Sequence, residues 1–200
     1  MLENPYRNKR LKYLSLPFIM VIMRTVRTIS RKDLSKEKIG LFLAGFVEGE
    51  GSFNVSLRRK KDYKVKWQVV MSFNVSQKDP SILYILKDQL KCGIIKKRKF
   101  DDLHSFDVTN SQAIIRKVIP YFLKYPLMSK SKLKNFAIFC EIAKMMDGGN
   151  HKNMAGLKKI LVLRERINEG KGRTRKYSIN DVFPLRNPQR LYVNSRSNRE

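Results

Sequence analysis

The residues best suited to chemistry lie in one short segment, Leu43 to Gly51, which reads LAGFVEGEG. It carries two acids, Glu48 and Glu50, at the expected C-terminal end of a helix, where the helix dipole disfavours an anion. A carboxylate beside unpaired backbone carbonyls suits a hard, oxygen-preferring ion such as Mg²⁺. The alternative is that both glutamates are solvated and pair with surplus Lys or Arg.

The same segment has an unusually bare helix face. Gly45 and Gly49 lie four residues apart, with Leu41 and Ala44 nearby. Residues at this spacing share one face of a helix, so another backbone could approach closely there. Because glycine costs about 1 kcal/mol relative to alanine inside a helix, two of them require a compensating contact.

The segment after the glutamates alternates between apolar and polar residues. Odd positions from 53 to 57 and from 65 to 75 are apolar, and the even positions are mostly polar. This period predicts two half-buried strands joined by a basic hairpin, with one polar face available to a ligand. The polar members are Asn54, Ser56, Arg58, Lys60, Lys64, Lys66, Gln68, Asn74 and Ser76.

The elements that must position these residues follow from periodicity and breakers. A helix over 36–48 precedes the strands, and a second helix over 80–90 leads to a hairpin of strands at 94–100 and 103–109. That hairpin adds four polar candidates, Lys96, Arg98, Ser105 and Asp107. Helical patterns continue near 111–118, 132–146 and 152–168, with breaks expected at Pro120, Pro126 and Gly148-Gly149. The order is αββαββα with extra C-terminal helices, an α+β fold.

The amino-acid composition limits the kinds of molecule that this protein is expected to bind. The chain has 200 residues and a net charge of +26, with 42% hydrophobic residues, enough for a core. So large a positive excess favours a polyanion, either nucleic acid or an anionic membrane surface. The longest uncharged apolar run, Tyr13 to Met23, is too short to span a bilayer. Cys92 and Cys140 form neither a disulfide framework nor a CxxC zinc motif, which favours a reducing compartment.

The two ends differ in composition from the middle. Residues 1–35 are basic around an apolar patch, and this resembles an organellar transit segment, although a basic arm on nucleic acid and coding sequence outside the domain are alternatives. We expect the folded domain over 36–170 and an irregular basic tail over 171–200. A chloroplast or mitochondrial location follows if the first segment is a targeting signal, and a bacterial cytoplasm is the alternative.

The segment from Leu43 to Gly51 closely resembles the motif of the LAGLIDADG homing endonucleases. Further similarities follow in order over about residues 36–175. They are Asn74-Val75-Ser76-Gln77, Tyr125-Pro126-Leu127 with Lys130 and Lys132, His151, Gly156-Leu157, the helix from Ile160 to Ile167, and Asn168. The resemblance implies the αββαββα fold, with an antiparallel, saddle-shaped sheet lying on DNA.

The resemblance also implies catalytic roles. Glu50 corresponds to the acid that binds the metal, with the Gly49 carbonyl as a further ligand. Gln77 would position the attacking water, and Lys132 or Lys130 would stabilise charge in the transition state, although either lysine could instead be a phosphate contact. The implied cofactor is Mg²⁺ or Mn²⁺, with Ca²⁺ as a non-catalytic substitute. The polar strand residues would face the major groove, and Glu48 would be structural.

Because the chain carries one copy of the motif, the resemblance implies a homodimer. Its interface would contain Leu41, Ala44, Gly45, Glu48 and Gly49. The leading hypothesis is a metal-dependent DNA endonuclease of the intron-homing type that cuts a long, nearly palindromic double-stranded site. The alternatives are an RNA-binding intron maturase, a bifunctional protein, and a catalytically inactive DNA-binding protein of the same fold.

Overall fold

The computed structural model describes residues 34–99, 101–169 and 175–184. The chain divides into two compact units, Met1–Ile39 and Gly40–Glu200. In the first unit, the Lys38 N–H donates to the Ser35 hydroxyl at 3.3 Å, at the start of a helix. The described residues contain no helix that is long and apolar enough to cross a membrane. The targeting segment expected over 1–35 lies almost entirely outside these residues.

The order of helices and strands matches the order expected from the sequence. The elements are α2 (Lys36–Glu50), β1 (Gly51–Arg59), β2 (Trp67–Gln77), α3 (Ser81–Leu90), β3 (Ile94–Lys97), β4 (His104–Val108), α4 (Ser111–Ala113), the π-helix η2 (Ile114–Val118), α5 (Ile119–Lys124), α6 (Lys130–Asp147), the 3₁₀ turn η3 (Asn150–Lys152), α7 (Met154–Glu165) and α8 (Ile179–Val182). The αββαββα order with additional C-terminal helices is confirmed, as is the α+β class.

The four strands form one antiparallel sheet in the order β1-β2-β4-β3. Odd-numbered residues of β1 and β2 are buried except at the strand ends Arg59 and Gln77, whereas even-numbered residues are half-buried or exposed. The register pairs Asn54 with Ser72 and Arg58 with Gln68, so even positions on neighbouring strands share a face. The predicted polar face therefore exists.

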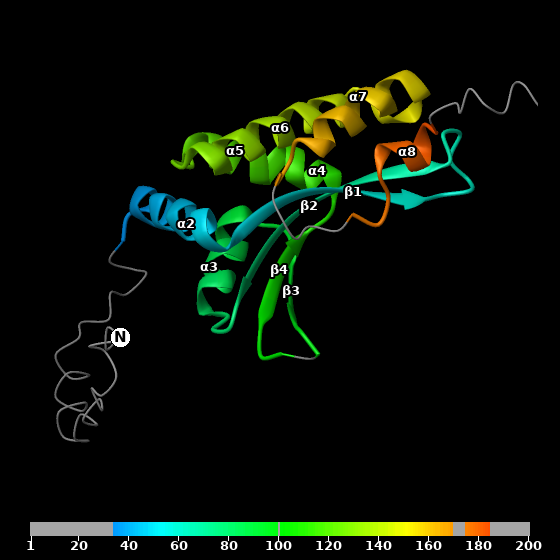
Figure 1. Ribbon diagram of the computed structural model, residues 1–200. Helices are drawn as coiled ribbons and strands as arrows, with labels where there is room; N and C mark the ends of the chain where they lie inside the picture. Colours follow the sequence, from blue (N-terminus) through cyan, green and yellow to red (C-terminus); the bar gives the residue numbers. More distant parts are fainter. Residues whose placement is uncertain (1–33, 100, 170–174, 185–200) are drawn as a thin grey trace, which may run out of the picture. The chain divides into compact units, whose positions relative to one another are not determined.

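The buried face of the sheet carries the core. Figure 1 shows α5, α6 and α7 along one side of the sheet, where α6 packs on β1 and η2 packs on β2. Phe53 lies at the centre of this layer, with its ring centroid 5.2 Å from that of Phe73 and 5.2 Å from that of Phe139. The apolar residues of the alternating strands and the apolar stripe of α6 thus pack together in one aromatic core.

The connection between β1 and β2 is longer than the sequence predicted. Residues 60–66 form a hydrogen-bonded turn, closed by the Lys60 N–H donating to the Lys66 carbonyl at 3.0 Å. The expectation that Lys64 and Lys66 occupy strand positions is therefore wrong. Lys66 adopts a left-handed backbone with φ of 59°, which ends the alternation before Trp67.

The helix near 111–118 does not end at Pro120 as expected. The chain stays helical from Ser111 to Lys124, because η2 contains a wider turn in which the Ile119 N–H bonds to the Ile114 carbonyl. A proline lacks an N–H and its ring crowds the carbonyl four residues earlier. The π-turn, which uses bonds to the fifth residue back, accommodates the proline without breaking the helix.

Residues 175–184 of the C-terminal segment form defined structure. The expectation of an irregular tail is wrong for residues 175–184, which contain α8 with a capping box between Ser178 and Asp181. Trp67 is 8% exposed, and the Tyr177 ring packs against it with centroids 5.0 Å apart. The domain limits of 36 and 170 stay predictions.

Candidate nucleic-acid interface and catalytic site

The helix α2 ends at Glu50, and β1 begins at the next residue, Gly51. A Cβ at Gly51 would overlap both the side chain and the backbone of Val47, so this direct turn from helix to strand requires glycine. The turn leaves Glu50 exposed at the end of the helix. The acid therefore lies where the polar sheet face starts.

Glu48 faces the loop that precedes α6. Its Oε1 accepts the Met128 N–H at 2.9 Å and its Oε2 accepts the Ser129 N–H at 3.2 Å, which confirms the structural role expected for it. Burial acts to raise the pKa of Glu48, but the bonds from Ser129 and Met128 outweigh burial, and the pKa lies below 4.5. Ser129 in turn caps α6 by accepting the Lys132 N–H at 3.3 Å.

Lys132 is the lysine that the fold brings to this junction. Its Nζ donates to the Gly51 carbonyl at 2.6 Å, and the side chain is half-buried. Burial lowers the pKa of Lys132, and the nearby carboxylates of Glu48 and Glu50 only partly oppose that effect. Lys130, at the first position of α6, is exposed. Of the two candidates, Lys132 is the one held beside the acids.

Gln77 reaches the same end of the sheet through strand register. Gly51 pairs with Val75, so Gln77, two residues further along β2, lies where α2 enters β1. Its Oε1 accepts the N–H of Lys78 at 2.9 Å. The structure thus places Glu50, Gln77 and Lys132 around one junction, although three different elements supply them.

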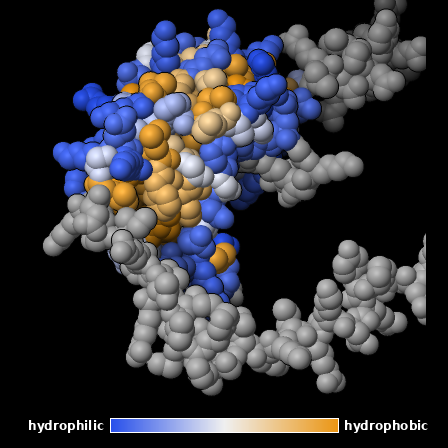
Figure 2. Space-filling view, turned by 90° about the vertical axis from the view of Figure 1, so that its left-hand side faces the viewer, coloured by the Kyte–Doolittle hydropathy of each residue, from blue (hydrophilic) through white to orange (hydrophobic). Residues whose placement is uncertain are grey.

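One face of α2 is open. A Cβ at Gly45 or Gly49 would meet no atom of the described residues within 4 Å. Leu41 and Phe42 are 52% and 57% exposed, and Figure 2 shows an apolar patch within hydrophilic surface on the side where α2 lies. Such a patch on a helix with two glycines fits a close protein contact.

Two residues of α2 differ from the sequence-based expectation. Ala44 is only 3% exposed because it faces its own core beside Leu43 and Val47, so its assignment to a dimer interface is wrong. Gly40 was missed. A Cβ there would overlap the ring of Tyr125, so this glycine serves packing within the chain. The available signal was a third glycine on the same helix.

The polar face of the sheet is joined by hydrogen bonds between strands. The Asn74 amide donates to Asp107 Oδ1 at 2.6 Å, and the Asn54 amide donates to Asn74 Oδ1 at 3.3 Å. Ser105 also donates to Asp107, at 3.1 Å. Polar groups from β1, β2 and β4 therefore form one surface with donors and acceptors, and Asp107 is tied into it rather than free to contact a ligand alone.

The cations lie toward the ends of the strands. Arg58 is exposed on β1, and Lys96 is exposed on β3 opposite Ser105. Arg98 lies one residue beyond β3, with its Nε 3.5 Å from Asp101 Oδ1. Lys60, Lys64 and Lys66 lie in the turn between β1 and β2. Amides occupy the middle of the face and cations its ends, as suits base contacts flanked by phosphate contacts.

The described residues contain no group of three or more His, Cys, Asp or Glu that could hold a metal ion by itself. Glu50 is the exposed carboxylate at the junction, beside the carbonyl end of α2. This donor set is hard and suits Mg²⁺ or Mn²⁺, but one chain supplies too few ligands for a complete site. Further oxygens would have to come from a second copy or from phosphates.

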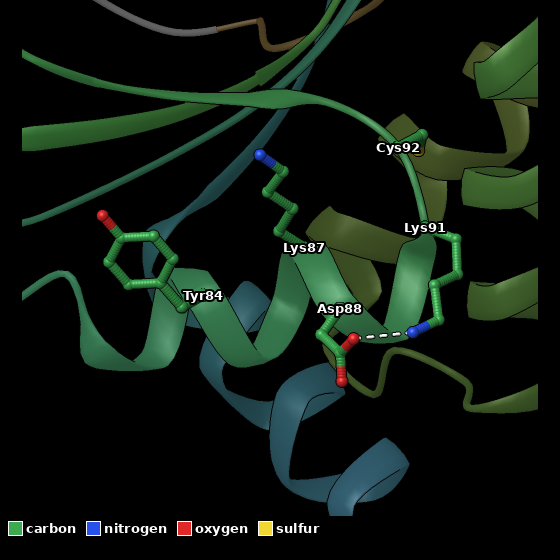
Figure 3. Close-up of a pocket in the computed structure, with 5 residues that line it drawn as sticks. All are labelled: Tyr84, Lys87, Asp88, Lys91 and Cys92. Atoms are coloured by element: carbon green, nitrogen blue, oxygen red, sulfur yellow. Dashed lines mark hydrogen bonds and ion pairs between the residues drawn. The ribbon is translucent and has the colours of Figure 1, made fainter.

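A separate shallow pocket of about 420 Å³ lies along α3 (Figure 3) and is lined by Tyr84, Lys87, Asp88, Lys91 and Cys92. Lys91, the residue directly after that helix, pairs with Asp88 at 2.6 Å. None of its lining residues was assigned to the site. On the strand end opposite Gln77, the half-buried His104 ring contacts the Lys78 carbonyl at 3.0 Å, so its Nδ1 has a hydrogen-bond partner.

Comparison with known proteins agrees with this arrangement. The family model described as LAGLIDADG endonuclease matches residues 43–143. "Probable intron-encoded endonuclease 2" of Neurospora crassa is 30% identical over 148 residues, covering 72% of this chain and 32% of the relative. The chain therefore spans about a third of the length of that relative.

Solved structures show the same fold. The homing endonuclease I-TnaI is 34% identical, with a TM-score of 0.62 over 66% of this chain and 89% of that one. The LAGLIDADG homing endonuclease I-LtrWI bound to target DNA is 29% identical, with a TM-score of 0.66 over 73% of this chain and 48% of that one. The family model covers half of the sequence, and it begins at the segment that carries Glu48 and Glu50. The chain belongs to the LAGLIDADG endonuclease family.

Proposed function

We propose that this chain is a site-specific endonuclease of the intron-homing type, which hydrolyses double-stranded DNA with a divalent metal as a homodimer. The observation that carries the proposal is the junction of α2 and β1. There an exposed carboxylate, Glu50, lies beside a half-buried cation, Lys132, at the edge of a polar sheet face. A protein that only bound nucleic acid would have no need of an anion at that surface.

The sheet supplies binding and register. Arg58 and Gln68 form a cross-strand pair on the polar face, and a guanidinium and an amide are the groups that read guanine and adenine edges in the major groove. The exposed lysines of the turn after β1 would contact phosphates whatever the base sequence of the DNA. Because the sheet and the acid share one junction, docking the sheet in the groove brings the phosphate backbone to Glu50.

We assign each residue at the junction a different role in the reaction. Glu50 and the Gly49 carbonyl would hold Mg²⁺ or Mn²⁺, which when bound neutralises phosphate charge and activates water for hydrolysis. Lys132, fixed by the Gly51 carbonyl, stabilises negative charge that develops in the transition state. Gln77, at the end of β2, orients the attacking water. Glu48 holds the loop from which α6 begins and so positions Lys132.

The homodimer supports the same scheme. One chain offers one Glu50, and the open face with Gly45 and Gly49 lies on the helix that ends at this acid. Two copies packed through that face would bring two junctions together, one for each DNA strand. Each copy would then read one half of a nearly palindromic site. An organellar location for the protein stays a prediction.

The experiment is cleavage of a plasmid library that carries randomised paired half-sites, in the presence of Mg²⁺. We expect the wild-type chain to linearise a small set of related sequences. Glu50→Gln should abolish cleavage yet bind the same sequences equally or more tightly, because it removes a metal ligand and also an anion facing phosphates. Mg²⁺-dependent cutting by that variant would disprove the site assignment. Specific binding without cutting by the wild type would show a DNA-binding protein without catalysis.

A further inference from the structure

Residues 175–184, here called the brace, are fastened to the domain by buried and charged contacts. Arg164 is 3% exposed, and among the described residues it is the one charged residue that is buried. Its Nη2 donates to the Tyr177 carbonyl at 2.8 Å and its Nε donates to the Val55 carbonyl of β1 at 3.1 Å. A buried charge is costly unless its hydrogen bonds are satisfied, so Arg164 ties the brace to the sheet in a defined position.

A second arginine reinforces this attachment. Arg175 donates to the Ile167 carbonyl at 3.0 Å, and its Nε lies 3.3 Å from Glu165 Oε2. At the other end of the brace, Val182 is buried. The brace is thus held on both sides of Tyr177.

Tyr177 packs on the last rung of the β1–β2 ladder. Arg59 and Trp67 form that rung, directly before the turn of residues 60–66. The Tyr177 ring meets the Trp67 ring edge-on at 5.0 Å, and the Arg59 guanidinium lies 5.3 Å from the Trp67 ring and 5.7 Å from the Tyr177 ring. Figure 1 shows α8 beside this end of the hairpin. These ring and cation–π contacts hold the pair of Arg59 and Trp67 in place, and this pair is here called the clamped rung.

The adjacent rung carries the candidate base-reading residues. Arg58 pairs with Gln68 across the two strands. Arg58 directly precedes Arg59 and Gln68 directly follows Trp67, so this pair is one rung away from the clamped rung. Successive residues of a strand project to opposite faces, so Arg58 and Gln68 point away from the face that Tyr177 covers. The brace can therefore fix the depth and tilt of this pair without contacting DNA.

The turn beyond the clamped rung is strongly basic. A pocket of about 380 Å³ there is lined by Arg59, Lys60, Lys61, Lys66, Trp67 and Asp181. Asp181 belongs to the brace, and hydrogen bonds from Ser178, with a smaller effect of the Arg59 charge, lower the pKa of Asp181. The brace thus supplies one wall of the pocket at the base of the turn.

We infer that the brace determines base specificity at the hairpin end of each half-site, with Tyr177 as a positioning residue for Arg58 and Gln68. This inference rests on the proposed DNA-cleaving function. Without the brace, a two-stranded extension twists and bends more freely. The reading pair would then still attract DNA but would lose the fixed geometry on which discrimination between bases depends.

The test uses the full chain with Tyr177→Ala and, as the matched control, Tyr177→Phe, which keeps the ring. Trp67 is the one tryptophan of the sequence, so its fluorescence reports the brace directly and needs no DNA. We expect Tyr177→Ala to shift this emission to longer wavelength and Tyr177→Phe to leave it unchanged. Base preference is then measured by binding to duplexes that carry each single substitution of the site, without divalent metal.

At the positions sensitive to Arg58→Ala or Gln68→Ala, Tyr177→Ala should lower discrimination by at least about five-fold, the lower end of what one base contact contributes. Other positions should keep wild-type preference, and Tyr177→Phe should behave as wild type. Adding Tyr177→Ala to Arg58→Ala should cause no further loss at the Arg58 position.

Three results would overturn the inference. Shifted Trp67 emission with wild-type base preference would show that the brace only stabilises the fold, and so would an equal loss at all positions. A wild-type chain with no base preference anywhere would overturn the proposed function, and this inference with it. The Trp67 emission would still show whether Tyr177 holds the brace in place.

Discussion

The Nζ atom of Lys132 lies 2.6 Å from the carbonyl oxygen of Gly51. Lys132 is the third residue of α6, whereas Gly51 is the first residue of β1, directly after Glu50. This one bond joins the helix that carries the lysine to the strand that follows the acid. The ammonium group of Lys132 is therefore held against the backbone of the residue that follows Glu50.

This bond predicts different effects for the two candidate lysines. Lys132→Met should lower the single-turnover cleavage rate at saturating DNA on the order of 100-fold, because it removes a fixed donor near the reacting phosphate. Lys130→Ala should leave that rate unchanged and weaken binding to all duplexes slightly, as expected for an exposed phosphate contact. Quench-flow cleavage and binding titrations measure the two effects. Equal loss of rate in both variants would contradict the assignment.

Glu48 predicts an acid-sensitive contribution to stability. Its pKa is lowered in the folded chain, so its stabilising effect is present above pH 4.5 and is lost as the pH falls through the folded pKa. Glu48→Gln should cost about 1 kcal/mol of unfolding free energy at pH 7, a value reduced because the carboxylate is partly exposed. Urea titrations should show this difference shrinking below pH 4.5. Glu141→Gln, on the exposed side of α6, is the matched control and should show no such trend.

The glycines of α2 separate folding from association. Gly45→Leu should leave the melting temperature of one chain unchanged or higher, because its side chain would meet open space and glycine is a poor helix former. It should abolish the dimer in sedimentation. Gly40→Ala should instead destabilise the chain itself by about 1–3 kcal/mol, since its Cβ would overlap Tyr125. A wild-type chain that is monomeric at micromolar concentration and still cuts both strands would exclude the proposed dimer.

The sheet predicts a division between base and phosphate contacts. Arg58→Ala or Gln68→Ala should cost about 1–3 kcal/mol and relax preference at one base pair in each half-site. Lys60→Ala, in the turn, should weaken binding to every sequence and lower the salt dependence of log Kd by about one unit. Cleavage profiling at two salt concentrations distinguishes these outcomes. Unchanged base preference in both strand variants would exclude the sheet as the reading surface and favour the maturase alternative.

Local pattern predicted the sheet better than its connections. The alternation around Phe53 and Phe73 identified both faces because one face of each strand is buried. The turn at Lys66 was missed because a lysine with a positive φ leaves no signal in the sequence. Pro120 was taken as a break because the compensating π-turn depends on backbone geometry, not on residue type.

The candidate site residues were likewise predicted from the sequence only in part. The motif pointed to Glu50 as a candidate metal ligand and the resemblance supplied both candidate lysines, but only the tertiary structure shows that Lys132, and not Lys130, bonds to the backbone beside Glu50. Ala44 was misassigned because a small residue suits an inner helix face as well as an outer one. The order of residues 175–184 depends on Arg164 and Trp67, which are far away in sequence, and so could not be read from the composition of the tail.

The side chains of Arg164 and Asn168 have a consequence for how chains can associate. β1 is an edge strand, and its carbonyls at Val55 and Phe53 accept bonds from Arg164 and Asn168 at 3.1 and 2.9 Å. A strand from another chain that added to β1 would first have to displace both side chains. The outer edge of β1 is thereby protected against sheet extension and aggregation, so a second copy of this chain would have to meet it through another surface than this strand.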